Sequence, residues 1–260
     1  MPPVALVTGA ASGIGFAIAQ HLYQQGYQLI LTDVDLCSAE AAANKLLGRQ
    51  RLPQKNLLPL SLDVTDAQAM RDCIGVINNN FGRLDVVINN AGIQHVAPLE
   101  AFPVDTWRLI TDILLVGPAL LTRECLPLMR TQNFGRIVNI GSIHSLVASP
   151  YKSAYVAAKH GLLGFAKTVA LETADQNITI NTICPAYVKT QLVEVQITQQ
   201  AEAHGLTEEQ VIEQIMLAPM PKKQFVGMDE ICAAVSFLVS PECRTMTGQT
   251  VVLDGGWTVQ

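Results

Sequence analysis

The chain has 260 residues, of which 49% are apolar and 15% charged, and its net charge is −5. A chain this long and this apolar can bury a large core, which excludes global disorder. The acidic balance argues against a nucleic acid or an anionic membrane as partner. No apolar run approaches the roughly 20 residues that span a bilayer.

Cysteine and histidine are scattered along the chain. The six cysteines form no CxxC pair, and the five histidines show no HxxxH or HExxH spacing. This pattern predicts reduced, mostly buried thiols and no metal site. The N-terminus runs into a strand-like segment without a charged leader, so we expect no signal or transit peptide and a cytoplasmic location.

Short apolar runs rich in β-branched residues alternate with longer helical patterns along the whole chain. Most of these runs are apolar on both faces, as buried parallel strands are. The alternation predicts one doubly wound, Rossmann-type α/β domain over residues 1–260, with a seven-stranded parallel sheet and helices on both faces. The expected strands are Val4–Thr8, Gln28–Thr32, Leu57–Leu62, Leu84–Asn89, Arg136–Gly141, Ile178–Cys184 and Thr250–Leu253.

A glycine-rich turn follows the first strand and opens a helix expected over Gly13–Gln25. Glycines here let the backbone approach a pyrophosphate at the helix N-terminus, where unpaired N–H groups favour anions. The spacing G-x-x-x-G-x-G differs from the common G-x-G-x-x-G, but its place between strand and helix predicts a dinucleotide site. A purely structural turn is the alternative. The expected cofactor contacts are Gly9, Ser12, Gly13, Ile14 and Gly15.

Acidic residues end the second and third strands. Asp33 can accept hydrogen bonds from the adenosine ribose hydroxyls and repels a 2′-phosphate, and no basic residue is near it in the sequence. We therefore expect NAD rather than NADP, the alternative being a solvated acidic residue in a turn. Asp63 and Val64 are expected to face the adenine.

The next two strands end in Asn89-Asn90-Ala91-Gly92 and in Gly141-Ser142. Ligands bind at the carboxyl ends of strands in this architecture. Tyr155 and Lys159 are spaced i, i+4 and share a helix face, so Ser142 can meet Tyr155 beside a nicotinamide. A nearby ammonium lowers a tyrosine pKa by roughly one to three units from about 10. Such a shift would make Tyr155 a general acid/base near neutral pH.

Two segments depart from the strand–helix rhythm. Asp105–Met129 is apolar nearly all round, which predicts a helix in contact with both the core and another subunit. Thr190–Leu217 is rich in Gln and Glu and lacks a strand. We expect one or two helices there, before a helix that begins near Met228, forming a small lid over the ligand at about residues 190–217.

Basic side chains flank the expected catalytic residues. Lys152 precedes Tyr155 by three positions, and His144 follows Ser142 by two. A buried, unpaired cation is costly, so this placement suggests a small anion bound close to the reacting carbon. The alternative is that Lys152 points to solvent.

Taken in order, TGxxxGIG, NNAG, Ser142 and YxxxK resemble the short-chain dehydrogenase/reductase family over the whole chain. The resemblance implies that Tyr155 exchanges a proton with the substrate oxygen while Ser142 steadies that oxygen. It implies that Lys159 binds the nicotinamide ribose and acidifies Tyr155. Further cofactor contacts that it implies are Asn90, Gly92, Tyr155, Lys159, Val188 and Thr190.

One family residue is replaced. Where the family has an Asn in the helix after the fourth strand, beside a relay water for the lysine, this chain has Leu114. A Leu side chain cannot hydrogen-bond. Pro118 has no N–H to donate to the Leu114 carbonyl, so we hypothesise that this freed carbonyl accepts the relay water.

Shorter motifs resemble the bacterial D-3-hydroxybutyrate dehydrogenases, among them Asn89–His95, Lys152–Gly161 and Asp254–Thr258. The resemblance implies NAD-dependent oxidation of (R)-3-hydroxybutyrate to acetoacetate, a reaction of ketone-body metabolism, by a homotetramer. Tyr187 stands where these enzymes often have Trp, so chain-length preference can differ. Alternatives are a dehydrogenase for another secondary alcohol or 3-hydroxy acid, and a catalytically silent NAD-binding protein. The implied substrate contacts are Gln94, Ser142, His144, Lys152, Tyr155, Tyr187, Gln196 and Trp257.

Overall fold

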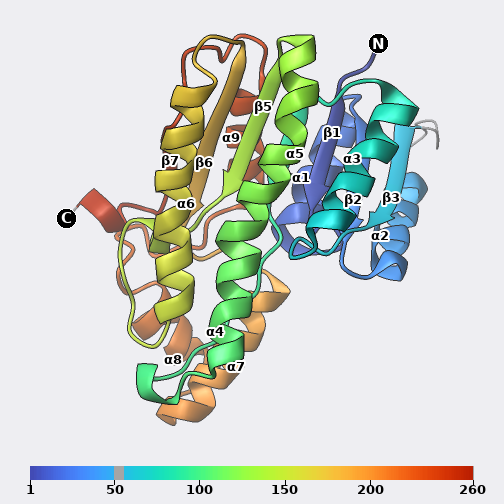
Figure 1. The fold of residues 1–260 in the computed structure, drawn as a ribbon. Coiled ribbons are helices and arrows are strands. Elements are labelled where there is room, and N and C mark those ends of the chain that lie inside the picture. Colours follow the sequence, from blue (N-terminus) through green and yellow to red (C-terminus); the bar gives the residue numbers. More distant parts are fainter. Residues whose placement is uncertain (50–55, 260) are drawn as a thin grey trace.

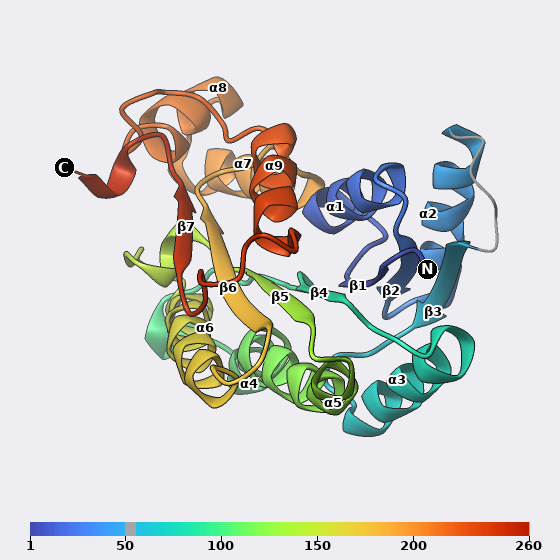
Figure 2. The same cartoon turned by 90° about the horizontal axis from the view of Figure 1, so that it is seen from above.

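The computed structural model describes residues 1–49 and 56–259 and is built around one parallel sheet. Its seven strands follow the order β3-β2-β1-β4-β5-β6-β7 (Figures 1 and 2). All strand pairs are parallel, which confirms the predicted Rossmann-type fold, and only some strand ends differ from expectation, by one or two residues. The strands are β1 Val4–Thr8, β2 Gln28–Asp33, β3 Leu57–Ser61, β4 Val86–Asn89, β5 Gly135–Ile140, β6 Ile178–Pro185 and β7 Thr250–Leu253.

Helices cover both faces of the sheet. Figure 2 shows α1, α2 and α9 on one side and α3, α4, α5 and α6 on the other. Within the described residues, no helix combines the length and apolarity needed to cross a bilayer. The helices are α1 Gly13–Gln24, α2 Leu36–Arg49, α3 Ala67–Phe81, α4 Val104–Thr111, α5 Gly117–Gln132, α6 Ser153–Glu172, α7 Gln191–His204, α8 Glu208–Val211 and α9 Met228–Val239.

Alternate residues of the central strands form two apolar layers, because successive side chains of a strand point to opposite faces. The layer facing α1 and α9 includes Val7 and Ile88, and the layer facing α3, α5 and α6 includes Leu6 and Val87. Each of these four side chains is fully buried. Burying one such side chain stabilises the fold by about 1.5–3 kcal/mol, so the two layers fix the sheet against its helices.

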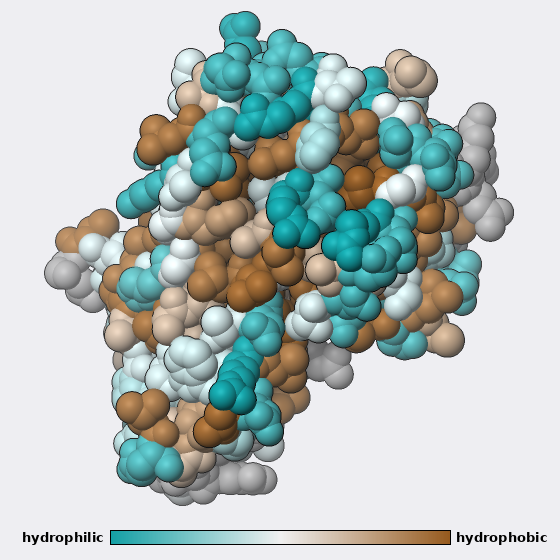
Figure 3. Space-filling model, viewed as in Figure 1, coloured by the Kyte–Doolittle hydropathy of each residue, from teal (hydrophilic) through white to brown (hydrophobic). Residues whose placement is uncertain are grey.

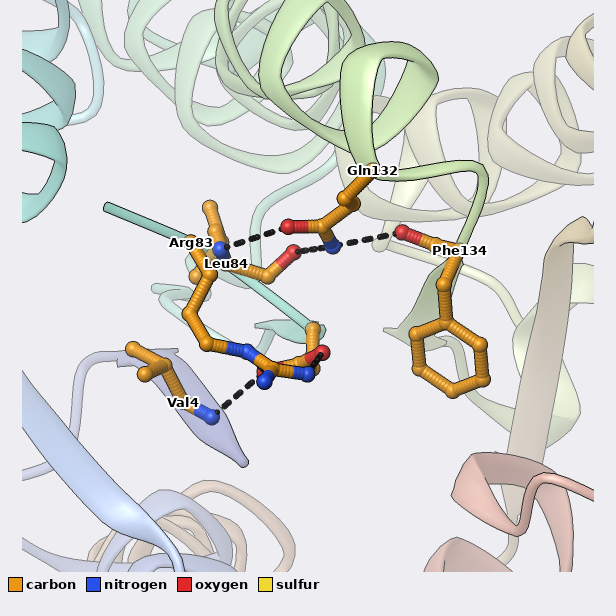
Figure 4. Close-up of polar contacts among 6 residues, drawn as sticks. Val4, Arg83, Leu84, Gln132 and Phe134 are labelled. Carbon is orange, nitrogen blue, oxygen red and sulfur yellow. Dashed lines mark hydrogen bonds and ion pairs between the residues drawn. The ribbon is translucent and has the colours of Figure 1, made fainter. Parts of the chain in front are cut away.

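A polar network aligns the strands at the amino edge of the sheet (Figure 4). The buried Asp85 carboxylate accepts a hydrogen bond from the Val4 amide at 2.7 Å and pairs with Arg83 at 2.6 Å. The Gln132 side chain bonds both backbone groups of Leu84, at 3.3 and 2.6 Å. These contacts hold β1, β4 and the end of α5 in register, so that the strands also end together at the opposite edge.

The predicted continuous helix over Asp105–Met129 is wrong in one respect, because a π-helical turn over Asp112–Val116 separates α4 from α5. The Gly117 amide there donates to the Asp112 carbonyl, five residues back. Pro118 cannot donate the next α-helical bond, which favours the insertion of an extra residue at this point. The stretch is not buried all round, because Val116 for example is exposed in the single chain.

The segment after β6 forms α7 and α8, in agreement with the expected one or two helices. Thr190 caps α7 by accepting a hydrogen bond from the Val193 amide at 3.3 Å. Gly205 ends α7 in the left-handed conformation, with φ of 62°. A small apolar cluster of Val193, Ile197, Val211 and Met216, against which Tyr187 and Phe225 pack, holds these helices to the end of β6.

Candidate active site

One cavity of about 780 Å³ opens at the carboxyl edge of the sheet. It runs from the turn after β1 to α7 and collects residues from distant parts of the sequence. Two predicted contacts do not line it, Gly15 and Trp257. The predicted residues that do line it are Gly9, Ser12, Gly13, Ile14, Asp33, Asp63, Val64, Asn90, Gly92, Gln94, Leu114, Ser142, His144, Lys152, Tyr155, Lys159, Tyr187, Val188, Thr190 and Gln196.

The glycine turn lies against the cavity in a conformation that requires glycine. Gly9 and Gly13 have left-handed φ values of 59° and 56°. A Cβ on Gly15 would lie 2.3 Å from the Gly9 carbonyl oxygen, so Gly15 allows the close approach of helix and turn instead of touching a ligand. Ser12 caps α1 without a side-chain hydrogen bond, which leaves donors at the helix N-terminus facing the cavity. This cradle fits a pyrophosphate.

Asn90 ties the glycine turn to the end of β4. Its side-chain amide donates to the carbonyls of Thr8 and Gly9, at 2.9 and 3.0 Å. The Thr8 hydroxyl in turn accepts from the Asn90 amide at 3.0 Å. Asn90 therefore holds the glycine turn in place, in addition to lining the cavity.

The end of the cavity next to β2 and β3 is acidic, since Asp33 and Asp63 line it. The Asp33 carboxylate accepts a hydrogen bond from the Ala11 amide at 3.3 Å. The Asp63 carboxylate is held within its own turn by the amide and hydroxyl of Thr65, at 2.8 and 2.7 Å. Among the described residues that line the cavity, the basic side chains are Lys152 and Lys159. Lys159 donates a hydrogen bond to the end of β5, which lies three strands, or about 14 Å, from β2. Lys159 is therefore far from Asp33, which ends β2.

Ser142, Tyr155 and Lys159 meet at the end of β5. Ser142 caps a short 3-10 helix and its hydroxyl accepts from the His144 amide at 3.2 Å. The Tyr155 phenol hydrogen-bonds the Ser142 hydroxyl. The Lys159 ammonium donates to the Ile140 carbonyl at 2.6 Å and lies 5.7 Å from the centre of the Tyr155 ring.

In the polypeptide alone, the pKa of Tyr155 is raised and not lowered. Burial raises the pKa of Tyr155, and the hydrogen bond with Ser142 only opposes that rise. Burial also lowers the pKa of Lys159 to about 8, because the ammonium has lost most of its hydration. The i, i+4 spacing of Tyr155 and Lys159 predicts that the two side chains are neighbours, but it does not predict how deeply they are buried.

Lys152 is a buried cation beside this group. It is 5% exposed, and no carboxylate of the described chain pairs with it. Its ammonium lies 5.6 Å from the centre of the Tyr187 ring, and burial lowers its pKa to about 8. Burial and then the charge of Lys152 lower the pKa of His144 to about 4, so His144 is neutral at pH 7. The alternative that Lys152 points to solvent is therefore wrong.

Two glutamine side chains from distant parts of the chain meet at the cavity. The Gln196 amide on α7 donates to the Gln94 side-chain oxygen at 3.2 Å. The Gln94 side-chain nitrogen is buried and has no hydrogen-bond partner among the described residues. The side-chain N–H of Gln94 is thus available to donate a hydrogen bond to a ligand in the cavity.

Trp257 supports the site from behind. Its ring stacks on Tyr187 with centroids 6.2 Å apart, and it meets the His144 ring edge-on at 6.0 Å. Asp254 holds the turn that carries Trp257 by accepting from the Thr258 amide and hydroxyl, at 2.8 and 2.7 Å. Trp257 therefore braces two lining residues and is not itself a wall of the cavity.

Leu114 lies in the π-helical turn and is buried. A Cβ on Gly92 would lie 3.0 Å from its side chain, so Leu114 packs on the turn after β4.

The cavity-lining residues that the sequence analysis did not predict are mainly apolar. The i, i+4 spacing of Leu109 and Ile113 was the signal by which some of them could have been predicted. The additional apolar lining residues include Leu62, Leu109, Ile113, Val193 and Val195.

Comparison with known proteins agrees with this geometry. A family model described as Enoyl-(Acyl carrier protein) reductase matches residues 9–258. The uncharacterized oxidoreductase YxjF of Bacillus subtilis is 42% identical over 257 residues, which cover 99% of this chain and 98% of that protein. The D-beta-hydroxybutyrate dehydrogenase of Rhizobium meliloti is 41% identical over 261 residues, 100% of both chains.

A solved structure extends the likeness to the whole fold. Sorbitol-6-phosphate 2-dehydrogenase SrlD from Erwinia amylovora superposes with a TM-score of 0.92 at 27% identity, covering 98% of this chain and 99% of that one. Family model, relatives and structure agree over nearly the full length. The chain therefore belongs to the short-chain dehydrogenase/reductase family of NAD(P)-dependent oxidoreductases.

Proposed function

We propose that the protein oxidises (R)-3-hydroxybutyrate to acetoacetate with NAD, and catalyses the reverse reaction. The observation that carries this proposal is the buried Lys152 ammonium, which has no carboxylate partner in the described chain and lines the same cavity as Ser142 and Tyr155. An isolated buried cation is unfavourable unless a ligand supplies the opposite charge. A short hydroxy acid supplies that charge close to its hydroxyl carbon.

The surrounding groups favour a carboxylate. Gln94 offers a side-chain N–H without a partner, and neutral His144 lies close enough to Lys152 for its pKa to respond to the lysine charge. Charge-assisted hydrogen bonds are about twice as strong as neutral ones, so Lys152 supplies most of the affinity and Gln94 and Gln196 fix the orientation. Tyr187, braced by Trp257, limits the length of the substrate.

In the proposed oxidation, Tyr155 takes the hydroxyl proton of the substrate while Ser142 holds the same oxygen by a hydrogen bond. When bound, NAD supplies the hydride acceptor at nicotinamide C4 and a positive charge that favours the phenolate. Lys159 binds the nicotinamide ribose and remains largely protonated at pH 7. Tyr155 would thus take the hydroxyl proton while Ser142 holds the oxygen as the alcohol becomes a ketone.

We infer that NAD is preferred to NADP. Asp33 lines the adenosine end of the cavity, and its negative charge opposes a 2′-phosphate. No basic residue among the described lining residues lies at that end to offset the charge. The ribose hydroxyls of NAD, in contrast, can donate hydrogen bonds to the same carboxylate.

We assign α7 and α8, at about residues 190–217, the role of a lid. The Gln196–Gln94 hydrogen bond links α7 to the body of the domain. Thr190 lies opposite the glycine turn, since a Cβ on Gly13 would be 3.7 Å from the Thr190 methyl group. A lid over both ligands excludes water and completes the substrate contacts.

The proposal keeps the Leu114 carbonyl as the acceptor of a relay water. The π-helical turn over Asp112–Val116 supports it, because π turns and Pro118 both disturb the regular pairing of carbonyls. A crystal structure with no water between the Leu114 oxygen and the Lys159 ammonium would remove this part of the proposal.

A homotetramer in the cytoplasm remains part of the proposal. Exposed apolar side chains at Val104 and Val116 support a subunit contact along α4 and the π-helical turn. Figure 3 also has hydrophobic surface over the middle of α5 and α6. Sedimentation at micromolar concentration tests the assembly.

The decisive experiment measures NADH formation from the two enantiomers of 3-hydroxybutyrate. The (R) enantiomer should react with NAD at a far greater kcat/KM than the (S) enantiomer or neutral secondary alcohols, and NADP should support little turnover. Faster reaction of a neutral alcohol would favour another dehydrogenase activity. Binding of NAD without turnover of any hydroxy acid would favour a catalytically silent protein.

A further inference from the structure

The residue immediately before Lys152 has an unusual backbone conformation. Tyr151 has a left-handed φ of 68°, which non-glycine residues adopt rarely and at a cost. Its side chain is exposed, so packing of the ring does not explain the conformation. Asn133, in contrast, is left-handed at the end of α5, where an Asn commonly closes a helix.

The turn that contains Tyr151 contacts three parts of the proposed anion site. The Tyr151 carbonyl accepts a hydrogen bond from the Ala97 amide at 3.0 Å, which fixes the segment that carries Gln94. The Ser149 hydroxyl lies within 3.4 Å of the His144 ring nitrogen Nε2. Lys152 follows Tyr151 directly. One turn therefore holds the backbones or side chains of the groups that face the carboxylate.

From this arrangement we propose that Tyr151 is a positioning residue, whose left-handed backbone sets the spacing of Lys152, His144 and Gln94 around the substrate carboxylate. The inference rests on the proposed function. The side chain of Tyr151 takes no part; the conformation of its backbone does.

The constraint follows from what is fixed on each side of the turn. The Lys152 carbonyl accepts the Val156 amide at 2.9 Å, which anchors Lys152 to the start of α6. A change of φ at Tyr151 to the usual negative range rotates the chain before Tyr151 against the chain after it. It must therefore break either the Ser149–His144 contact on one side or, if that contact is kept, the placement of the Tyr151 carbonyl and Lys152 on the other. Strain that the surroundings maintain in this way is characteristic of functional sites.

The test compares residues that accept a left-handed φ with residues that do not. Tyr151→Gly and Tyr151→Asn accept it, whereas the β-branched Tyr151→Val and Tyr151→Thr resist it. The readout is KM and kcat for (R)-3-hydroxybutyrate and for its neutral methyl ester. Asn133→Val is the control for left-handed strain outside the cavity, and circular dichroism confirms folding of each variant.

We expect Val and Thr at position 151 to raise KM for the acid on the order of tenfold, with little change for the ester. Gly and Asn should keep the preference for the acid, and Asn133→Val should keep it too. An unchanged acid KM in the folded Thr or Val variant overturns the inference. Loss of the preference in the Gly and Asn variants also overturns it, because the ring would then be responsible, and this arm holds even if the β-branched variants do not fold.

The proposed function fails in a different way. If Lys152→Met leaves the preference for the acid intact, the carboxylate assignment itself is wrong. If Lys152→Met abolishes the preference while the β-branched variants at Tyr151 retain it, only the role of Tyr151 is wrong.

Discussion

Replacement of Lys152 by Met separates the cost of burying an ammonium from its use in binding. Burial lowers the pKa of Lys152 from 10.5 to about 8, a difference worth about 3 kcal/mol. In this range the unfolded chain binds more protons than the folded one, so the unfolding free energy of the native protein rises between pH 8 and pH 10.5. Lys152→Met should therefore be as stable as the native protein or up to about 3 kcal/mol more stable at pH 7, with a smaller difference at higher pH.

Substrate binding should change in the opposite direction. Removing one member of a buried charge pair leaves the other unpaired and costs about 2–4 kcal/mol, or about 30- to 1,000-fold in kcat/KM. The methyl ester of the substrate has no charge to pair, so its kcat/KM should change little. NAD binding should also be retained, because Lys152 lies at the substrate end of the cavity.

Two measurements check this reasoning. Chemical unfolding at pH 7 and pH 9.5 gives the stability of both proteins, and initial rates with acid and ester give the discrimination. A variant that is less stable at pH 7 and loses activity equally on acid and ester would show that Lys152 has a structural role, which would refute the reasoning.

Three other changes give distinct outcomes. The first concerns pH: because the pKa of Lys152 in the free protein is about 8, the ratio of kcat/KM for the acid to kcat/KM for the ester should be constant below pH 8. Above pH 8 this ratio should fall about tenfold per pH unit, as Lys152 loses its charge. A ratio that stays constant up to pH 10 would contradict this. Asp33→Ser should raise the Kd for NAD about tenfold, through loss of charge-assisted hydrogen bonds, and increase the use of NADP; an unchanged ratio of the two cofactors would count against Asp33. Gly15→Ala places a Cβ 2.4 Å from the Asn90 side chain, so Tm and NAD affinity should both fall, whereas Gly75→Ala in α3, with open space around it, should keep both.

The sequence was informative wherever local chemistry decides the structure. Runs such as Val4–Thr8 predict buried strands because they are apolar on both faces, and Gly9, Gly13 and Gly15 mark a turn that only glycines can form. The i, i+4 spacing of Tyr155 and Lys159 likewise predicts that they face one cavity. These features depend on residues close together in the chain.

Features that depend on packing between distant segments were not predictable. The burial that raises the pKa of Tyr155 results from the whole surrounding fold. Trp257 stacks behind Tyr187 because of the course of the C-terminal turn. The spacing of the two residues in the sequence does not predict this contact. The left-handed Tyr151 has only a weak signal, since Pro150 before it fits a turn that would ordinarily place Gly or Asn at this position.

Acetoacetate and acetone provide the most direct test of a carboxylate anchored beside the reacting carbon, because they differ only in the carboxylate. The measurement is the initial rate of NADH oxidation by the native protein with each ketone. We predict that kcat/KM for acetoacetate exceeds that for acetone by about 30- to 1,000-fold, the effect of one buried charge pair. Similar values for the two ketones would contradict the account.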